Sequence, residues 1–159
     1  MSARVNHFKT VPSLIKSLSS VTMASHATSI NLTIKDLIDI RASQMNGCAF
    51  CLDMHVKQAK INGERELRIY HLPIWRESPL FTAKEKAALA LTEALTRITE
   101  HGITEEIYRS TQEHFSEVEI SELTFAIALI NSWNRMQLLS QMEPGSQDSA
   151  YGLEHANLK

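Results

Sequence analysis

The chain has 159 residues, of which 43% are hydrophobic, and it carries 16 basic and 18 acidic side chains. This length suits one ordinary domain, and the near balance of charge argues against a basic surface for nucleic acid or anionic lipid. No apolar run approaches the roughly 20 residues of a membrane span, and the first residues lack the pattern of a secretory signal. We therefore expect a soluble, cytoplasmic protein whose two cysteines are normally thiols.

Helix-favouring residues recur at helical spacing, and only five glycines and four prolines interrupt them, which predicts an all-α fold. Start and stop signals divide the chain into six to seven helices. These are expected at about 10–24, 33–45, 48–61, 64–70 and 82–98, then from 104, and at 116–141. Together they predict a single domain over 1–145, followed by a polar, mobile tail over 146–159.

Two apolar faces predict that the chain associates with itself. The stretch Leu123–Ile130 lies in a helix that is apolar nearly all round. The helix at 82–98 has a narrow, alanine-rich face that ends at Ile98. Because a small protomer has few ways to cover both faces, we expect a homo-oligomer.

The segment Cys48-Ala-Phe-Cys51-Leu-Asp-Met-His55 concentrates the reactive groups of the chain. On a helix that Cys48 begins, all three side chains share one face. Cys51 and His55 are four residues apart and are therefore surface neighbours, whereas Cys48 lies in the first turn. The spacing predicts a dithiol with a base beside one of its members.

Thiolates, not thiols, attack peroxides and disulfides, and an unperturbed thiol pKa of about 8.5 leaves little thiolate at neutral pH. The positive end of the helix dipole would favour the Cys48 thiolate, while His55 could take the proton of Cys51. Oxidation of one cysteine to a sulfenic acid and attack by the other would close a disulfide. This cycle needs neither metal nor flavin.

Other interpretations of the motif remain open. Two cysteines one turn apart can be small buried hydrophobes, and a dithiol can act as a redox sensor or assembly module without turnover. Zinc could bind Cys48, Cys51 and His55, with His71 or Asp36 as a fourth ligand. A thioredoxin-like site also uses CxxC, but its βαβ setting is not visible here.

The sequence resembles the carboxymuconolactone decarboxylase and alkylhydroperoxidase D-like proteins, in their redox-active CxxC branch. The resemblance covers about 5–145 and is carried by DLIDIRASQMNGCAFCLDMH, LPIWRESPLFTAKEKAALALTEALTR and FAIALINSWNR. The family signature is an acidic residue, eleven positions, CxxC, three residues and His. Cys48, Cys51 and His55 match it, and the acidic position falls on Asp36, where the family has glutamate.

The resemblance implies an alkylhydroperoxidase D-like helical domain that reduces hydroperoxides, with Asp36 and His55 as a proton relay to the dithiol. It implies an external dithiol donor, such as a lipoylated or thioredoxin-like protein, and a trimer or hexamer. Asp39, one turn after Asp36, could take part, and Asp36 could instead cap a helix that begins at Thr33. Because Cys51 is adjacent to His55, we choose it as the attacking thiol, with Cys48 resolving and exposed to the reductant; the reverse assignment is the alternative.

Three further residues are candidates for the lining of the pocket. Trp75, Trp133 and Asn134 could line the pocket, although aromatic residues at such spacings usually belong to the core. The histidines outside the motif are scattered, and we interpret them as surface or core residues. They are His7, His26, His71, His101, His114 and His155.

Overall fold

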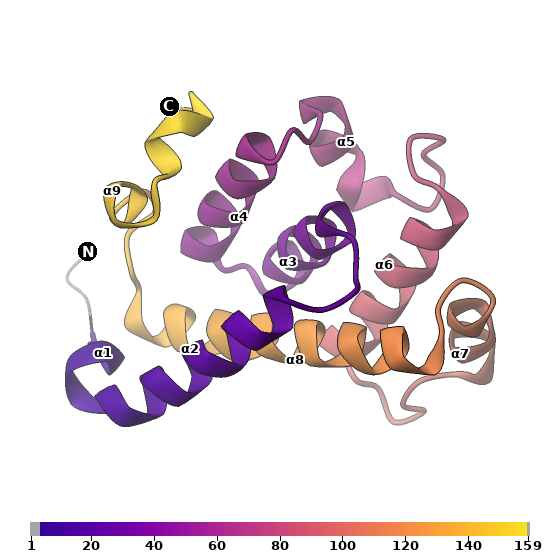
Figure 1. Cartoon of the computed structure of the whole chain (residues 1–159), viewed down its shortest axis with the longest axis horizontal. Coiled ribbons are helices and arrows are strands. Elements are labelled where there is room, and N and C mark those ends of the chain that lie inside the picture. The colour runs from indigo at the N-terminus through magenta and orange to yellow at the C-terminus, as the bar shows by residue number, and fades with distance from the viewer. Residues whose placement is uncertain (1–3, 159) are drawn as a thin grey trace.

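The computed structural model describes residues 4–158 and is helical throughout, with no strand in that range (Figure 1). It confirms the all-α prediction and adds two short helices, α1 and α9, to the predicted ones. The helices are α1 His7–Thr10, α2 Pro12–His26, α3 Leu32–Asn46, α4 Ala49–Ile61, α5 Glu66–His71, α6 Ala83–Thr96, α7 Glu105–Gln112, α8 Glu117–Ser140 and α9 Asp148–Tyr151. Two 3₁₀ turns, Leu72–Ile74 and Leu153–Ala156, complete the described part.

Most helix boundaries lie where local chemistry predicts them. Pro12 occupies the first turn of α2, where its missing N–H leaves no donor unsatisfied. Capping boxes begin α6 and α8, since Thr82 pairs with Glu85 and Ser116 pairs with Glu119.

Helix α3 begins one residue earlier than predicted, at Leu32 rather than Thr33. Its N-cap is Asn31, whose side chain accepts the Thr33 N–H at 2.8 Å, so Thr33 lies inside the helix. Asparagine is as good an N-cap as threonine, and sequence alone does not choose between neighbouring candidates. The alternative role of Asp36 as a cap of a helix beginning at Thr33 is therefore wrong.

Helix α3 is the central element, and it packs against α4, α6 and α8 (Figure 1). Ile34 and Ile38 on one side of α3 join a cluster with Leu123 and Ile127 of α8. A second cluster, which includes Leu37, forms between α3, α4 and the segment from α5 to α6. Full burial of each such side chain contributes about 1.5–3 kcal/mol relative to exposure. The helix that bears Asp36 and Asp39 is thus held on several sides.

The apolar stretch of α8 is largely covered by the protomer itself. Leu123 and Ile127 are fully buried in the core, whereas Phe125 is 61% exposed. On the alanine-rich face the exposed residue is Ile98, at 71%. Self-association therefore stays a prediction. The apolar surface that could support it is smaller than the sequence indicated.

The segment after residue 145 is folded onto α4, in place of the expected mobile tail. Leu153 is 3% exposed, and the Lys57 ammonium lies 2.7 Å from carboxylate oxygens of both Asp53 and Asp148. The mostly polar sequence of this segment conceals the apolar residues that anchor it, of which Leu153 is one. The domain boundary at 145 stays a prediction. None of the described helices is long and apolar enough to cross a membrane.

Candidate redox site

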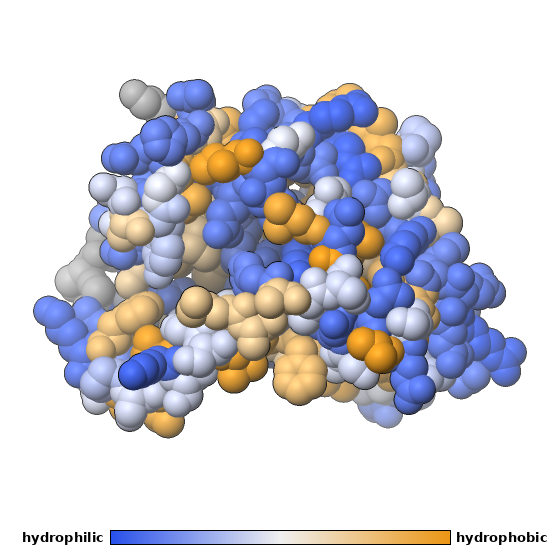
Figure 2. All heavy atoms as spheres, viewed as in Figure 1, coloured by the Kyte–Doolittle hydropathy of each residue, from blue (hydrophilic) through white to orange (hydrophobic). Residues whose placement is uncertain are grey.

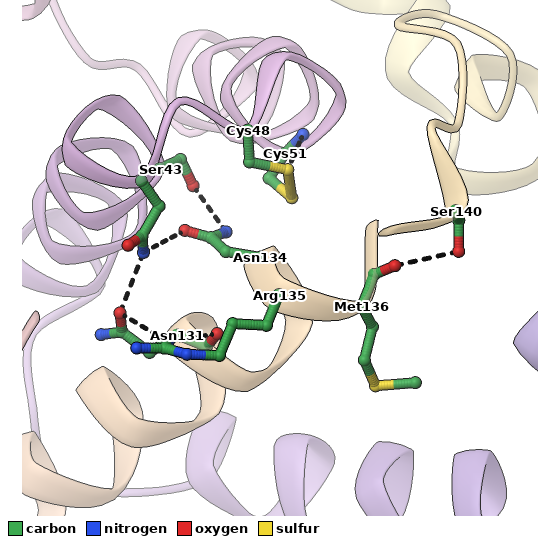
Figure 3. Close-up of a disulfide and its surroundings, with 9 residues drawn as sticks. Ser43, Cys48, Cys51, Asn131, Asn134, Arg135, Met136 and Ser140 are labelled. Carbon is green, nitrogen blue, oxygen red and sulfur yellow. Dashed lines mark hydrogen bonds between the residues drawn. A yellow bond between two sulfur atoms is a disulfide. The ribbon is translucent and has the colours of Figure 1, made fainter. Parts of the chain in front are cut away.

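The two cysteines lie at the start of α4, as predicted, and form a disulfide (Figure 3). Gly47 ends α3 with a positive φ of 68°, a conformation that favours glycine. Cys48 is the N-cap of α4, and its Sγ accepts the Cys51 N–H at 3.3 Å. The Cα atoms are 5.3 Å apart, within the usual range for a disulfide. Local sequence thus places Cys48 at the positive end of a helix.

Both cysteines are buried, but only one of them lines a cavity. Cys48 is 2% exposed and Cys51 is 1% exposed. A cavity of about 730 Å³, lined by α2, α3, α4, α8 and the C-terminal segment, touches Cys51 and not Cys48. Figure 2 shows the molecule hollowed on this face, between α2 and α4. The expectation that Cys48 is exposed to a reductant is therefore wrong.

His55 lines the same cavity as Cys51. Its Nδ1 lies 3.0 Å from Gln58 Oε1 and 3.6 Å from Asp39 Oδ2. Both neighbours are acceptors, so Nδ1 carries the proton of the neutral ring and Nε2 keeps its lone pair. The arrangement leaves Nε2 as the basic nitrogen of His55.

Asp36 also lines the cavity, but its carboxylate has a different direct partner. Asn62 Nδ2 lies 3.2 Å from Asp36 Oδ1 and 3.0 Å from Oδ2. Because Asn62 is the C-cap of α4, this contact joins α3 to the end of the helix that carries the dithiol. Asp36 acts on His55 through its charge, which raises the pKa of the imidazole.

Burial governs the ionisation of the three groups. It lowers the pKa of His55 to about 4, and hydrogen bonding to Gln58 partly opposes that change. It raises the pKa of Asp39 to about 7 and that of Asp36 to about 6. These directions follow from the cost of placing a charge where water is scarce. At neutral pH, His55 is therefore unprotonated and able to accept a proton.

Behind the disulfide lies a network of buried and partly buried amides, of which the sequence indicated Asn134 alone, as a pocket residue. Asn134 Nδ2 donates to Ser43 Oγ at 3.1 Å (Figure 3). Asn46 Nδ2 lies 2.9 Å from the side-chain oxygens of both Asn131 and Asn134. The signal was two asparagines three residues apart, directly after the apolar stretch Leu123–Ile130. They tie α8 to the end of α3, just before Cys48.

The remaining candidates separate into cavity and core residues. Trp133 lines the cavity and donates its indole N–H to Thr22 Oγ1 at 2.9 Å. Trp75 is a core residue, 4% exposed, whose indole N–H donates to Glu93. Asn134 is fully buried and does not line the cavity.

His26 and His71 differ in their relation to the cavity. His26 lines the cavity, whereas His71 Nδ1 lies 3.1 Å from Ser78 Oγ. Within residues 4–158, no three His, Cys, Asp or Glu side chains are grouped so as to hold a metal ion.

Comparison with known proteins identifies the family. A sequence model of the carboxymuconolactone decarboxylase family matches residues 12–94, which is more than half of the chain. The chain belongs to the carboxymuconolactone decarboxylase family. The resemblance inferred from the CxxC segment is thus confirmed.

Relatives support the same fold over nearly the whole chain. The uncharacterized protein YdfG of Bacillus subtilis is 42% identical over 138 residues, which are 87% of this chain and 94% of that protein. A crystal structure from Agrobacterium tumefaciens superposes with a TM-score of 0.87 at 36% identity, covering 90% of this chain and 98% of that one. That protein, ATU0492, is of unknown function and was suggested to be the antioxidant defence protein AhpD.

A more distant structure extends the likeness in fold alone. The debrominase Bmp8 superposes with a TM-score of 0.76 at 20% identity, covering 92% of this chain and 78% of that one. Alkylhydroperoxidase D-like and debrominase neighbours therefore share the all-helical fold of this chain. The family includes enzymes, and the disulfide between Cys48 and Cys51 is compatible with redox activity.

Proposed function

We propose that this protein is a thiol-dependent peroxidase that reduces hydroperoxides through a dithiol–disulfide cycle. One observation carries the proposal: Cys51, which pairs with Cys48, lines the same cavity as the imidazole of His55. A cavity of about 730 Å³ has the size of ordinary small-molecule sites, so it is large enough to hold an organic hydroperoxide beside Cys51.

The oxidative half begins with the reduced dithiol. His55 Nε2 takes the proton of the Cys51 thiol, and the thiolate attacks the terminal oxygen of ROOH. The O–O bond breaks, the alkoxide takes a proton from the imidazolium, and ROH leaves a sulfenic acid on Cys51. The Cys48 thiol then loses its proton, and its thiolate attacks Cys51 Sγ. The S–O bond breaks, the departing hydroxide takes up that proton, and water leaves as the disulfide closes.

The reductive half also acts on Cys51. A thiolate of an external dithiol attacks Cys51 Sγ, and Cys48 leaves as a thiolate that the N-terminus of α4 stabilises. The second thiol of the donor attacks the mixed disulfide and releases Cys51, so that the donor leaves oxidised. A lipoylated or thioredoxin-like protein would supply such a dithiol.

Asp36 and His55 form the proton relay that the family signature implies. Asp36 supports His55 through its charge, because an ionised carboxylate on the cavity wall stabilises the imidazolium formed during the cycle. His55 is the proton-transfer base. General acid–base help of this kind commonly contributes about 10²–10⁴-fold in rate, so His55→Ala should nearly abolish turnover.

The decisive experiment is a turnover assay on the purified protein. Cumene hydroperoxide, tert-butyl hydroperoxide and hydrogen peroxide are each combined with dithiothreitol, dihydrolipoamide or reduced thioredoxin, and peroxide loss is followed over many equivalents. The control is Cys51→Ser, which keeps the size of the side chain and removes the nucleophile. Many turnovers with the parent and none with Cys51→Ser support a peroxidase.

Two other outcomes would contradict the proposal. If peroxide oxidises the dithiol once and no donor restores it with turnover, the protein is a dithiol sensor. If the reduced protein binds zinc tightly and its thiols then resist oxidation, the motif is a metal site. Mass spectrometry separates these outcomes, because disulfide formation makes the chain two hydrogens lighter and zinc makes it heavier.

A further inference from the structure

We propose that Asp39, one helical turn after the signature position, is the positioning residue that holds and charges His55. Asp36 then acts on the imidazole only at a distance. This inference rests on the proposed function, because it assigns the partner of the proposed base. It changes which carboxylate of α3 governs proton transfer to and from Cys51.

The contacts of the two carboxylates distinguish them. Asp39 Oδ2 lies 3.6 Å from His55 Nδ1. Both oxygens of Asp36 instead face Asn62 Nδ2, at 3.2 and 3.0 Å. An imidazolium formed during the cycle would be attracted to an ionised carboxylate at the Asp39 distance, whereas Asp36 is held by an amide at the far end of α4. Asp39 is therefore the carboxylate that lies directly beside the ring.

The second neighbour of His55 fixes the tautomer that Asp39 requires. Gln58 Oε1 lies 3.0 Å from the same Nδ1 that faces Asp39. With an amide oxygen and a carboxylate both directed at Nδ1, the ring proton stays on that nitrogen, and Nε2 remains free for the thiol proton. An imidazolium formed at Nε2 would then have a carboxylate beside its other N–H.

Several charged groups surround this pair. His26 of α2 and Lys35 of α3 favour the ionised form of Asp39. The Lys35 ammonium donates to the His26 carbonyl at 3.0 Å, and Glu122 of α8 acts on Lys35 in turn. Burial opposes ionisation and dominates, so that the pKa of Asp39 is raised to about 7. Asp39 thus changes charge in the pH range where the dithiol would work.

The chemical consequence concerns the reduced Cys51. When Asp39 is ionised, transfer of the thiol proton to His55 Nε2 forms an imidazolium–carboxylate pair, so the Cys51 thiolate is favoured. When Asp39 is protonated, the imidazolium lacks this partner and the thiol keeps its proton. The pH at which Cys51 becomes reactive should therefore follow the charge of Asp39.

The test measures thiol reactivity, which does not require peroxidase activity. In a Cys48→Ser background, the rate of alkylation of Cys51 by iodoacetamide is recorded from pH 5 to 10. An opposite charge in contact shifts a pKa by about 1–3, so Asp39→Asn should move the rise in rate upward by about one pH unit or more. Asp39→Glu, which keeps the charge, should restore much of the parent profile.

Two control variants are compared with Asp39→Asn in the same alkylation assay. Asp36→Asn, the same change one turn earlier, should move the profile by less than Asp39→Asn does. His55→Phe removes the ring and defines the profile of an unassisted thiol. Nitrogen NMR of His55 provides a second readout, and the neutral ring should carry its proton on Nδ1 in the parent.

Two results would decide against the assignment of Asp39, and a third would decide against the peroxidase alone. An Asp36→Asn profile displaced as far as that of Asp39→Asn, or farther, makes Asp36 the principal partner. A parent profile equal to that of His55→Phe shows that the ring does not govern the thiol. If the Asp39 effect is found but no peroxide is turned over, the proposed peroxidase fails and the assignment of Asp39 stands.

Discussion

Replacing Asn134 by alanine tests whether the buried amides behind the disulfide hold the residues before Cys48 in place. Asn134 is fully buried on α8, and its side chain connects that helix to Ser43 and Asn46 at the end of α3 (Figure 3). The substitution removes these connections without touching either sulfur. It should lower stability and loosen the start of α4 together.

The expected loss of stability can be estimated from the groups that lose a hydrogen-bond partner when Asn134 is replaced. Ser43 Oγ loses the donor Asn134 Nδ2, and one N–H of Asn46 loses its acceptor, while the other keeps Asn131. An unsatisfied buried polar group costs about 1–3 kcal/mol. Ser43 is fully buried and Asn46 is only partly buried, so we expect Asn134→Ala to lower the free energy of unfolding by about 1–3 kcal/mol.

Urea unfolding followed by circular dichroism measures this loss, with Ser132→Ala as the matched control on the same helix. Ser132 is exposed, and its hydroxyl donates only to the Ala128 carbonyl one turn before it, so its loss should stay within about 0.5 kcal/mol. Dithiothreitol should also reduce the disulfide faster in Asn134→Ala. A loss below 1 kcal/mol with an unchanged reduction rate would refute the reasoning.

Three further predictions address the dithiol, the signature carboxylate and assembly. Cys48→Ser should still consume one equivalent of hydroperoxide and accumulate a sulfenic acid on Cys51, whereas Cys51→Ser should consume none; rapid-quench mass spectrometry would show the reverse if Cys48 attacks first. Burial raises the pKa of Asp36 from 3.8 to about 6, so this carboxyl stabilises the fold below pH 3.8 and loses its contribution as pH rises to 6. At about 1.4 kcal/mol per pH unit, the loss has a ceiling of about 3 kcal/mol, and urea titrations of Asp36→Asn at several pH values should lack it. Light scattering should give the mass of a trimer or hexamer, and a well-folded monomer at micromolar concentration would contradict self-association through the surface around Phe125.

Local chemistry made much of the fold predictable. Capping boxes such as Thr82 with Glu85 stabilise helix starts through contacts that span only three residues. Gly47 ends α3 because of its own backbone freedom. The placement of Cys48, Cys51 and His55 on one helix followed from the same kind of short-range reasoning. These features can be predicted without knowing how the helices pack against one another.

Features that depend on contacts between distant segments could not be predicted. Leu153 anchors the C-terminal segment on α4 because α4 presents a surface that fits it, which the local sequence does not reveal. Asp39 and Asp36 are both acidic residues on α3, and spacing alone favoured neither. Only the packing of α3 on α4 brings Asp39 to His55 and Asp36 to Asn62. The expected exposure of Cys48 failed for the same reason, since neighbouring elements cover it.

The two sulfurs differ in environment, and the difference explains how one pair could serve both halves of a cycle. Cys48, at the N-terminus of α4, accepts a backbone N–H, which favours its thiolate and makes it a good leaving group. Cys51, one turn later, shares the cavity with His55, so its proton can be removed when needed and its sulfur can be attacked. If the environments were exchanged, the sulfur in the cavity would have no base and the departing sulfur no helix N-terminus. The order of the residues along α4, with the helix start first and the base last, is thus the reason why we propose attack at Cys51 and departure of Cys48.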